Sequence, residues 1–255
     1  MPITAPAFLM KYKWPRKKAR DLWTFWYRIT RGRLFVGQRM GHRLLFDLNN
    51  TVDKYLVAYG LYEEAQKRKL FAAAREAAQP GQPAVFIDVG AHWGIYALWA
   101  HDTGLFGRVV AVEADPRNLS QLNANLFLND LSGKIDIVGA AAAAAPGMLS
   151  LVRSTGRDIS TVASVTANSA AQSKVRAVAL DDIEPIQGGL IVAKIDVEGY
   201  EPEVIKGMHR LMSENRCLLQ IEVFDQTLSS FDKLMAECGF HSFGTIGNDR
   251  YYRNF

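Results

Sequence analysis

Cysteine is scarce in this chain of 255 residues, which holds only Cys217 and Cys238. Two cysteines do not form the framework of a disulfide-stapled domain, and they do not supply a cysteine zinc site. Cys217 opens an apolar segment, so we interpret it as a small core residue. Because this usage is typical of a reducing compartment, we expect a cytoplasmic protein.

Long apolar runs and the common nucleotide motifs are also missing. No stretch of about 18 apolar residues predicts a transmembrane helix, and the region before Lys11 is too short and proline-rich for a signal peptide. There is no GxxxxGK[ST] loop for ATP. A dinucleotide fingerprint needs glycine at 90, 92 and 95, but His92 and Ile95 occupy two of these positions, which counts against NAD or FAD.

The net charge of +4 hides an asymmetry along the chain. Residues 11–43 hold eleven Lys or Arg and one acid, Asp21, which gives +10, so the remainder carries 4 − 10 = −6. The basic character belongs to one segment, and nucleic-acid binding by the whole protein is not implied.

Residues 11–31 combine these basic residues with bulky apolar ones. Pro15 suits the first turn of a helix that runs to about Arg28. Trp and Tyr beside Lys and Arg are typical of an interfacial helix on an anionic membrane, at the inner membrane face. A helix that packs on its own domain with a basic outer edge has the same composition, and stacking of bases is a third interpretation.

The stretch Ala84–Gly94 organises the rest of the chain. It opens with a short apolar run rich in Val and Ile, which predicts a strand buried on both faces. Asp88, a glycine turn and an amphipathic run from Trp93 follow. A strand–turn–helix unit leaves free backbone N–H groups at the strand's carboxyl end, where ligands bind in open α/β sheets.

A second apolar strand ends in Glu113, 23 residues after Gly90. An acid at this position accepts hydrogen bonds from both hydroxyls of a ribose. Together with the form Asp-x-Gly-x-x-x-Gly over residues 88–94, it looks like the S-adenosylmethionine (SAM) loop of Rossmann-type methyltransferases. That ligand has no phosphate, so Asp88 need not repel it. The alternative is that Asp88 and Glu113 only cap the following helices.

From residue 84 onward, strands and helices alternate, which predicts right-handed βα units. We expect an α/β Rossmann-like methyltransferase fold: a mostly parallel seven-stranded sheet with helices on both faces and an antiparallel C-terminal hairpin. Ala140–Ala145 should turn into the next strand, and Ser154–Ser173 should form a loop. The predicted strands are 84–89, 108–113, 134–139, 148–152, 174–179, 190–195, 218–224, 240–243 and 250–253; the predicted helices are 93–103, 116–129, 202–211 and 227–237.

The segment Lys194–Glu201 lies at the carboxyl end of a predicted buried strand and should face the ligand crevice. Asp196 and Glu198 would place two carboxylates near a sulfonium cation, and a carboxylate can take the proton of an acceptor hydroxyl. Glu222, at the end of the next strand, is a weaker candidate for the acceptor side. With Glu222, the two acids could hold Mg²⁺ or Ca²⁺, but no His/Cys cluster supports a metal, and we predict none. Lys194 could pair with one acid, and Glu198 could instead cap the helix after Gly199.

Five segments carry a family resemblance over about residues 51–245. The chain resembles the FkbM-type methyltransferases, and Lys194–Glu201 is the most specific of the shared motifs. The family more often has Asn where this chain has His92. The motifs are Gly60-Leu-Tyr-Glu63, Phe86-Ile-Asp-Val-Gly-Ala-His-Trp-Gly94, Val112-Glu-Ala-Asp-Pro116, Ala179-Leu-Asp-Asp182 and Lys194-Ile-Asp-Val-Glu-Gly-Tyr-Glu201.

The resemblance implies a SAM-dependent O-methyltransferase acting on a hydroxyl of a sugar, glycan or related natural product. Glu113 would hold the ribose, Asp196 and Glu198 would line the transfer site, and His92 could add a base. The alternatives are a silent nucleoside-binding regulator and an NAD-linked enzyme on the same sheet. The expected cofactor contacts are Asp88, Gly90, Ala91, His92, Gly94, Glu113, Ala114, Ala140 and Asp196.

We expect three regions along the chain. Residues 1–50 form a basic aromatic extension with an amphipathic helix and a small hairpin. Residues 51–83 form a helical lead-in, with helices over 51–60 and 62–78, and Gln79–Pro83 breaks the chain. Residues 84–255 form the SAM-binding methyltransferase domain. No motif sets the oligomeric state.

Overall fold

The computed structural model describes residues 13–153, 163–166, 173–224 and 228–255. A seven-stranded sheet lies at its centre, built from β3 (Ala84–Val89), β4 (Arg108–Glu113), β5 (Asp136–Gly139), β10 (Leu190–Ile195), β11 (Arg216–Glu222), β12 (His241–Ile246) and β13 (Asp249–Arg253). The strand order is β12-β13-β11-β10-β3-β4-β5. All neighbours are parallel except β13, which is antiparallel to β11 and β12. The predicted fold is confirmed.

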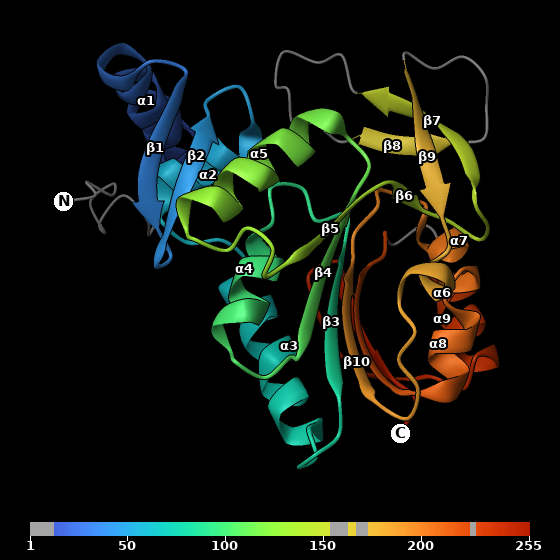
Figure 1. The fold of residues 1–255 in the computed structure, drawn as a ribbon. Helices are drawn as coiled ribbons and strands as arrows, with labels where there is room; N and C mark the ends of the chain where they lie inside the picture. The colour runs from blue at the N-terminus through green and yellow to red at the C-terminus, as the bar shows by residue number, and fades with distance from the viewer. Residues whose placement is uncertain (1–12, 154–162, 167–172, 225–227) are drawn as a thin grey trace.

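Helices cover both faces of this sheet (Figure 1). α3 (Glu64–Ala77), α4 (Ile95–Asp102) and α5 (Pro116–Leu128) lie on one side, and α6 (Leu180–Ile183), α8 (His209–Glu214) and α9 (Leu228–Glu237) on the other. Successive strand residues face opposite cores: Phe86 belongs to one cluster, and Val85 and Ile87 belong to the other. Because every residue of β3 and β10 is buried, these strands consist mostly of apolar residues, as predicted.

The helix predicted over 202–211 is wrong, because two short helices replace it. α7 (Glu201–Lys206) ends before Gly207, and α8 starts a new turn. A Cβ at Gly207 would lie 1.9 Å from the carbonyl oxygen of Ala143. The carboxylate of Asp181 also accepts the backbone N–H groups of Arg210 and Leu211, each at 2.9 Å, so it caps α8 as a separate helix.

A second, four-stranded sheet stands above the carboxyl ends of the central strands (Figure 1). It contains β6 (Ala141–Ala142), β7 (Gly147–Arg153), β8 (Ala163–Thr166) and β9 (Ser173–Val178). The predicted strands 148–152 and 174–179 are β7 and β9. The turn predicted over Ala140–Ala145 is wrong at Ala141 and Ala142, which form β6 and pair with β9. The continuous loop predicted over Ser154–Ser173 is wrong at β8, which pairs with β7; residues 154–162 and 167–172 lie outside the described residues.

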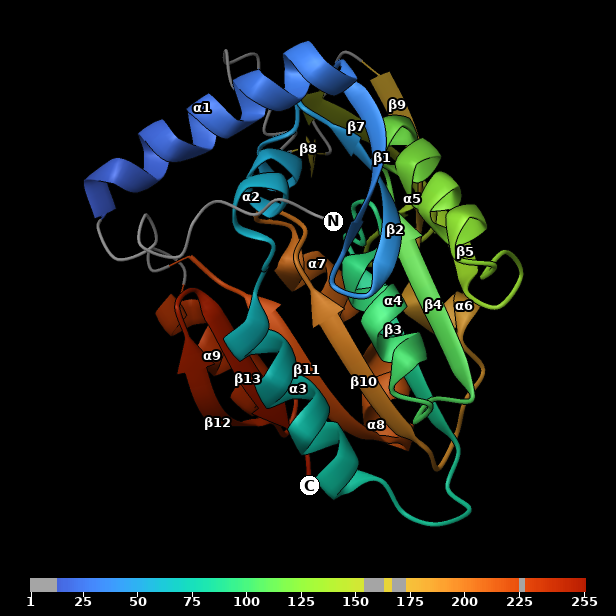
Figure 2. The same ribbon diagram turned by 90° about the vertical axis from the view of Figure 1, so that its left-hand side faces the viewer.

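The N-terminal elements pack on the same body (Figure 2). They are α1 (Lys13–Arg31), the hairpin β1 (Leu34–Arg39) and β2 (His42–Asp47), and α2 (Thr51–Tyr59), which ends at Gly60 with φ +76°. The predicted helices and hairpin are thus confirmed. Tyr27 and Phe46 share one core cluster with Phe86. None of the described helices combines the length and hydropathy that a bilayer-spanning segment needs.

Candidate active site

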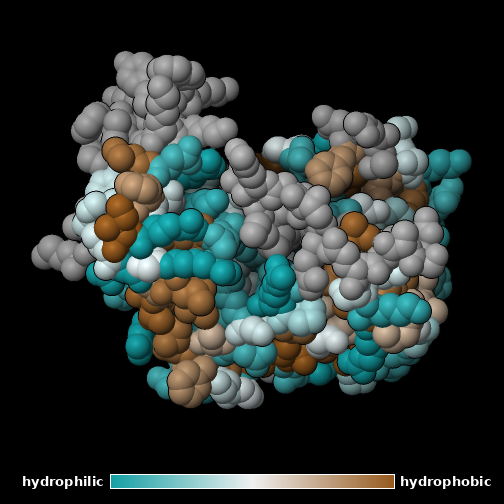
Figure 3. Space-filling view, turned by 90° about the horizontal axis from the view of Figure 1, so that it is seen from above, coloured by the Kyte–Doolittle hydropathy of each residue, from teal (hydrophilic) through white to brown (hydrophobic). Residues whose placement is uncertain are grey.

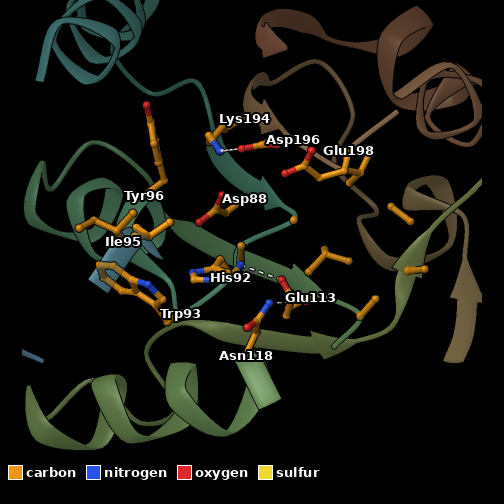
Figure 4. A pocket seen from close by; sticks show the side chains of 18 of the residues that line it. Asp88, His92, Trp93, Ile95, Tyr96, Glu113, Asn118, Lys194, Asp196 and Glu198 are labelled. Carbon is orange, nitrogen blue, oxygen red and sulfur yellow. Dashed lines mark hydrogen bonds and ion pairs between the residues drawn. The ribbon is translucent and has the colours of Figure 1, made fainter. Parts of the chain in front are cut away.

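A cavity opens at the carboxyl ends of β3, β4 and β10 (Figure 4). The parallel register pairs Val89 with Ile195 and with Val112, so these three strands end at one level. The topology therefore brings segments more than 80 residues apart to one place. Eight residues predicted to bind the cofactor line the cavity: Asp88, Gly90, Ala91, His92, Glu113, Ala114, Ala140 and Asp196.

The two glycines of the loop after β3 have different tasks. Gly90 has φ +75°, and a Cβ there would lie 1.8 Å from the backbone oxygen of Asp196. Only glycine allows the ends of β3 and β10 to approach this closely. Gly94, also predicted to bind the cofactor, is not a lining residue: its Cβ would meet Leu122 Cδ1 at 2.2 Å. The structure therefore places Gly94 in the packing of the loop on α5.

Glu113 holds the cofactor loop and faces the cavity with the same carboxylate. One oxygen accepts the N–H of His92 at 2.7 Å, and the other accepts the N–H of Asp115 at 2.7 Å and the amide of Asn118 at 3.3 Å. Burial raises the pKa of Glu113 to about 7, although these donors oppose the shift. Because a carboxylate offers about four acceptor positions, Glu113 retains capacity for a ligand.

Asp88 is buried at the end of β3. Its carboxylate accepts the backbone N–H of Ala97 in α4 at 3.1 Å. Burial raises the pKa of Asp88 to about 7, while the Lys194 ammonium opposes that rise. The capping interpretation is therefore correct in part for Asp88, which caps α4 while it lines the cavity. It is wrong for Glu113, because the side chain that caps α5 is that of Asp115.

His92 adopts φ +54°, which turns the loop toward α2. Its ring Nε2 lies 3.0 Å from the side-chain nitrogen of Asn50, the N-cap of α2. Burial lowers the pKa of His92 to about 4, although Asp196 opposes the shift. A neutral imidazole whose Nε2 lone pair accepts from Asn50 is a weak base. This geometry favours a loop-positioning role over the predicted role of catalytic base.

Lys194 joins the acids of the cavity. Its ammonium lies 2.7 Å from Asp196 Oδ2 and 4.9 Å from the centre of the Tyr96 ring (Figure 4). Burial would lower the pKa of Lys194, but Asp196 and Glu63 outweigh it and hold the pKa well above its ordinary value. Burial likewise opposes ionisation of Asp196, yet Lys194 keeps the pKa of Asp196 below its usual range. The pair is therefore ionised at neutral pH.

Three carboxyl groups gather at the edge of the cavity: one oxygen each of Asp196, Glu198 and Glu222 lies within 4.8 Å of the others. Burial and the negative charge of Asp196 raise the pKa of Glu222 to about 8 and that of Glu198 to about 7. Glu222 also shares a hydrogen bond with Asp196, so it is the protonated member at neutral pH. This geometry would admit a cation, and the absence of a metal requirement stays a prediction.

The tertiary structure adds residues that the sequence did not assign to the site. Asn50, Val52 and Tyr62 precede the central sheet in the chain but line the cavity. Two signals were available: the N-cap position of Asn50 and the shared motif Gly60-Leu-Tyr-Glu63, which contains Tyr62. Glu201, and not Glu198, accepts the N–H groups of Val197 and Gly199. Glu198, at φ +57°, is left to face the cavity, and Trp93, Tyr96 and Asn118 also line it.

Three features define a Rossmann-like methyltransferase fold. They are the strand order, the antiparallel C-terminal strand β13, and a cavity above β4, which ends in Glu113. A family model, the Methyltransferase FkbM domain, matches residues 88–242. That span is well over half of the chain, and the chain belongs to the FkbM methyltransferase family. No curated protein matches the chain significantly.

Two solved structures share the fold. The human methyltransferase 10 domain containing protein has a TM-score of 0.50 at 12% identity, over 93% of this chain and 95% of that one. The delta-N METTL16 MTase domain has a TM-score of 0.51 at 12% identity, over 93% and 94%. Methyltransferase FkbM from Methylobacillus flagellatus KT has a TM-score of 0.45 at 19% identity, over 70% of this chain. The match spans only 45% of that longer protein.

Proposed function

We propose that this chain is a SAM-dependent O-methyltransferase that acts on a hydroxyl of a sugar, glycan or related natural product. The observation that carries the proposal is that residues suited to bind the cofactor and residues suited to methyl transfer line the same cavity. Gly90 and Glu113 form a loop and an acid suited to a nucleoside. Asp196 and Glu198 bring an ionised carboxylate and a carboxyl with a pKa of about 7 to the same space.

The residues of the cavity fit this cofactor. The indole N–H of Trp93 is buried without a hydrogen-bond partner, although Trp93 lines the cavity. A buried donor without a partner is costly, so a ligand that accepts from Trp93 would be stabilised. Glu113 would hold the ribose hydroxyls, and the loop at Gly90 and Ala91 would hold the methionine part. When bound, SAM would supply a methyl group that the acceptor oxygen takes up, with the neutral thioether as the leaving group.

The side chains divide the remaining work. Asp196, ionised beside Lys194, places negative charge in the cavity and favours a cationic ligand. Glu198, with a pKa of about 7, can accept the proton that the acceptor hydroxyl loses, because a base works best when its pKa lies near the working pH. Tyr62 and Asn50 close the cavity from the N-terminal side and help to position the acceptor and exclude water.

Calorimetric titration with SAM, followed by a methyl-release assay on a panel of sugars and glycans, tests the function. We expect saturable SAM binding and release of the demethylated product with a hydroxyl acceptor. Binding without turnover on any acceptor would favour a silent nucleoside-binding regulator. Displacement of SAM by NAD would favour an NAD-linked enzyme.

Glu113→Ala is expected to weaken SAM binding by roughly tenfold to a hundredfold, since a hydrogen bond to a charged group contributes about 1.5–3 kcal/mol. Titration calorimetry measures the change, and circular dichroism checks that the loop bonded to Glu113 still folds. The control is Glu76→Ala, which removes an exposed glutamate from α3 and should leave affinity unchanged. Equal affinity in both variants would place the ribose elsewhere.

Methyl transfer is expected to accelerate as pH rises through about 7, because Glu198 must lose its proton to act as a base. Below that value the rate should fall about tenfold per pH unit. Glu198→Gln should lower turnover by about 10²–10⁴-fold and flatten the acidic limb of the pH–rate profile, in which the rate rises with pH. Glu203→Gln, on α7 outside the cavity, should keep the profile. A limb that persists in Glu198→Gln and disappears in Glu222→Gln would assign the base to Glu222.

A further inference from the structure

α1 has two different faces over residues 20–31. Thr24 and Tyr27 are buried, and the Tyr27 ring stacks on Phe35 at 5.2 Å, so this face is seated on the protein. The opposite face carries Leu22, Phe25, Trp26 and Ile29, at the i, i+3, i+4 and i+7 spacing of one helical stripe. Leu22, Phe25 and Ile29 are 68%, 62% and 69% exposed. Packing on the protein's own domain therefore explains one face only.

Neighbouring residues extend this apolar stripe. The exposed side of β1 adds Leu34 and Val36. Hydrophobic and hydrophilic residues lie side by side over the left of the surface in Figure 3, where α1 and β1 are found. The segment 11–43 that contains the stripe has a net charge of +10, as counted above. An exposed apolar stripe within a strongly basic segment matches the two forces that bind a helix to an anionic bilayer.

We propose that α1 lies in the surface of an anionic lipid bilayer, with Leu22, Phe25, Trp26 and Ile29 inserted among the headgroups. Trp is favoured at this depth because its ring is apolar while its N–H stays wet. Charge complementarity selects anionic lipid over a zwitterionic surface. The proposal does not depend on methyl transfer, since it concerns a face outside the cavity.

The bound helix would bring the cavity to the bilayer. Arg28 of α1 donates to Asn49 Oδ1 at 2.6 Å, and the next residue, Asn50, contacts the His92 ring at 3.0 Å. Figure 1 shows α1 beyond the carboxyl ends of the central strands, and the cavity opens at those same ends. A hydroxyl acceptor held at the membrane surface, such as a glycan on a lipid carrier, would then lie close to the site.

Vesicle sedimentation of the full chain tests the proposal. We compare phosphatidylcholine vesicles with vesicles that also contain phosphatidylglycerol, and expect binding only to the latter, weakened by salt. The triple variant Leu22→Ser, Phe25→Ser, Ile29→Ser should bind on the order of 100-fold more weakly, since three large apolar side chains no longer leave water. The matched control is Phe127→Ser on α5, where the native side chain is 75% exposed; it should bind as the native chain does.

Three results would overturn the proposal. These are binding that is equal on both vesicle types, binding that the triple variant retains, and absence of binding to either vesicle. Light scattering of the native chain and the triple variant tests whether a second copy of the chain covers the stripe instead of a bilayer. If the native chain self-associates, the triple variant does not, and neither binds vesicles, the stripe is a protein interface. Titration with SAM tests the cavity independently of the vesicle experiment. If the membrane proposal fails, the proposed function is therefore unaffected.

Discussion

Lys194→Met is expected to destabilise the folded protein by about 3–5 kcal/mol, because it leaves the partly buried Asp196 and the buried Asp88 without their neighbouring cation. Lys194 is buried and its ammonium lies 2.7 Å from Asp196 Oδ2. The ammonium also opposes the rise in the pKa of Asp88. Methionine keeps the length and apolar stem of lysine, so the loss reports charge and not volume. Urea denaturation measures the difference in unfolding free energy.

The matched control is Lys206→Met, which removes the exposed ion pair with Glu203 on α7. Exposed pairs contribute about 0–1 kcal/mol, so this variant should stay near the native stability. If Lys194→Met were no more destabilising than Lys206→Met, the pair of Lys194 and Asp196 would contribute no more to stability than an exposed ion pair does.

The effect of Lys194→Met should also depend on pH in a definite direction. The pKa of Asp196 is lowered in the folded protein, so its contribution is present above the ordinary pKa of Asp, about 4, and is lost as pH falls through the folded value. The pKa of Lys194 is raised, so its contribution is complete below the ordinary value, about 10.4, and is lost only as pH rises through the folded value. The stability difference should be largest between these limits and shrink in acid.

Gly90→Ala is expected to lower SAM affinity about 1000-fold or more and to destabilise the protein by more than about 3 kcal/mol. The added Cβ would lie 1.8 Å from the backbone oxygen of Asp196, so the loop after β3 and the end of β10 would have to separate. The left-handed conformation alone costs a non-glycine residue about 1–2 kcal/mol. The collision adds to that cost and moves both the cofactor loop and Asp196.

The chain offers a close control for this prediction. Gly81 has the same φ of +75°, but a Cβ there would meet nothing within 4 Å. Gly81→Ala should therefore cost only the conformational term, about 1–2 kcal/mol, and leave SAM affinity unchanged. Calorimetry and urea denaturation of the two variants separate collision from backbone strain. Equal losses in both variants would show that the approach of Gly90 to Asp196 has no role in the site.

The central strands and the cofactor loop could be predicted from sequence for a local reason. A strand buried on both faces must consist mostly of apolar residues, and β3 and β10 do. Asp88 and Glu113 stood out because Glu113 ends one such strand and Asp88 precedes the last residue of another. The break at Gly207 could not be predicted, because its causes are Ala143 and Asp181, which are distant in the chain. β8 lies in a polar segment whose pairing with β7 no local pattern reveals.

The sequence by itself determined the order of strands and helices, the loop at Gly90, the acid at Glu113 and the family, because each of these depends on residues adjacent in the chain. Only the tertiary structure decided that Asn50 meets His92 and that Glu222 joins Asp196. It alone decided which face of α1 stays exposed. The first two contacts join residues 42 and 26 positions apart in the chain, and the exposed face of α1 depends on how the helix packs on β1. A local hydrophobic or hydrogen-bonding pattern carries no information on such packing.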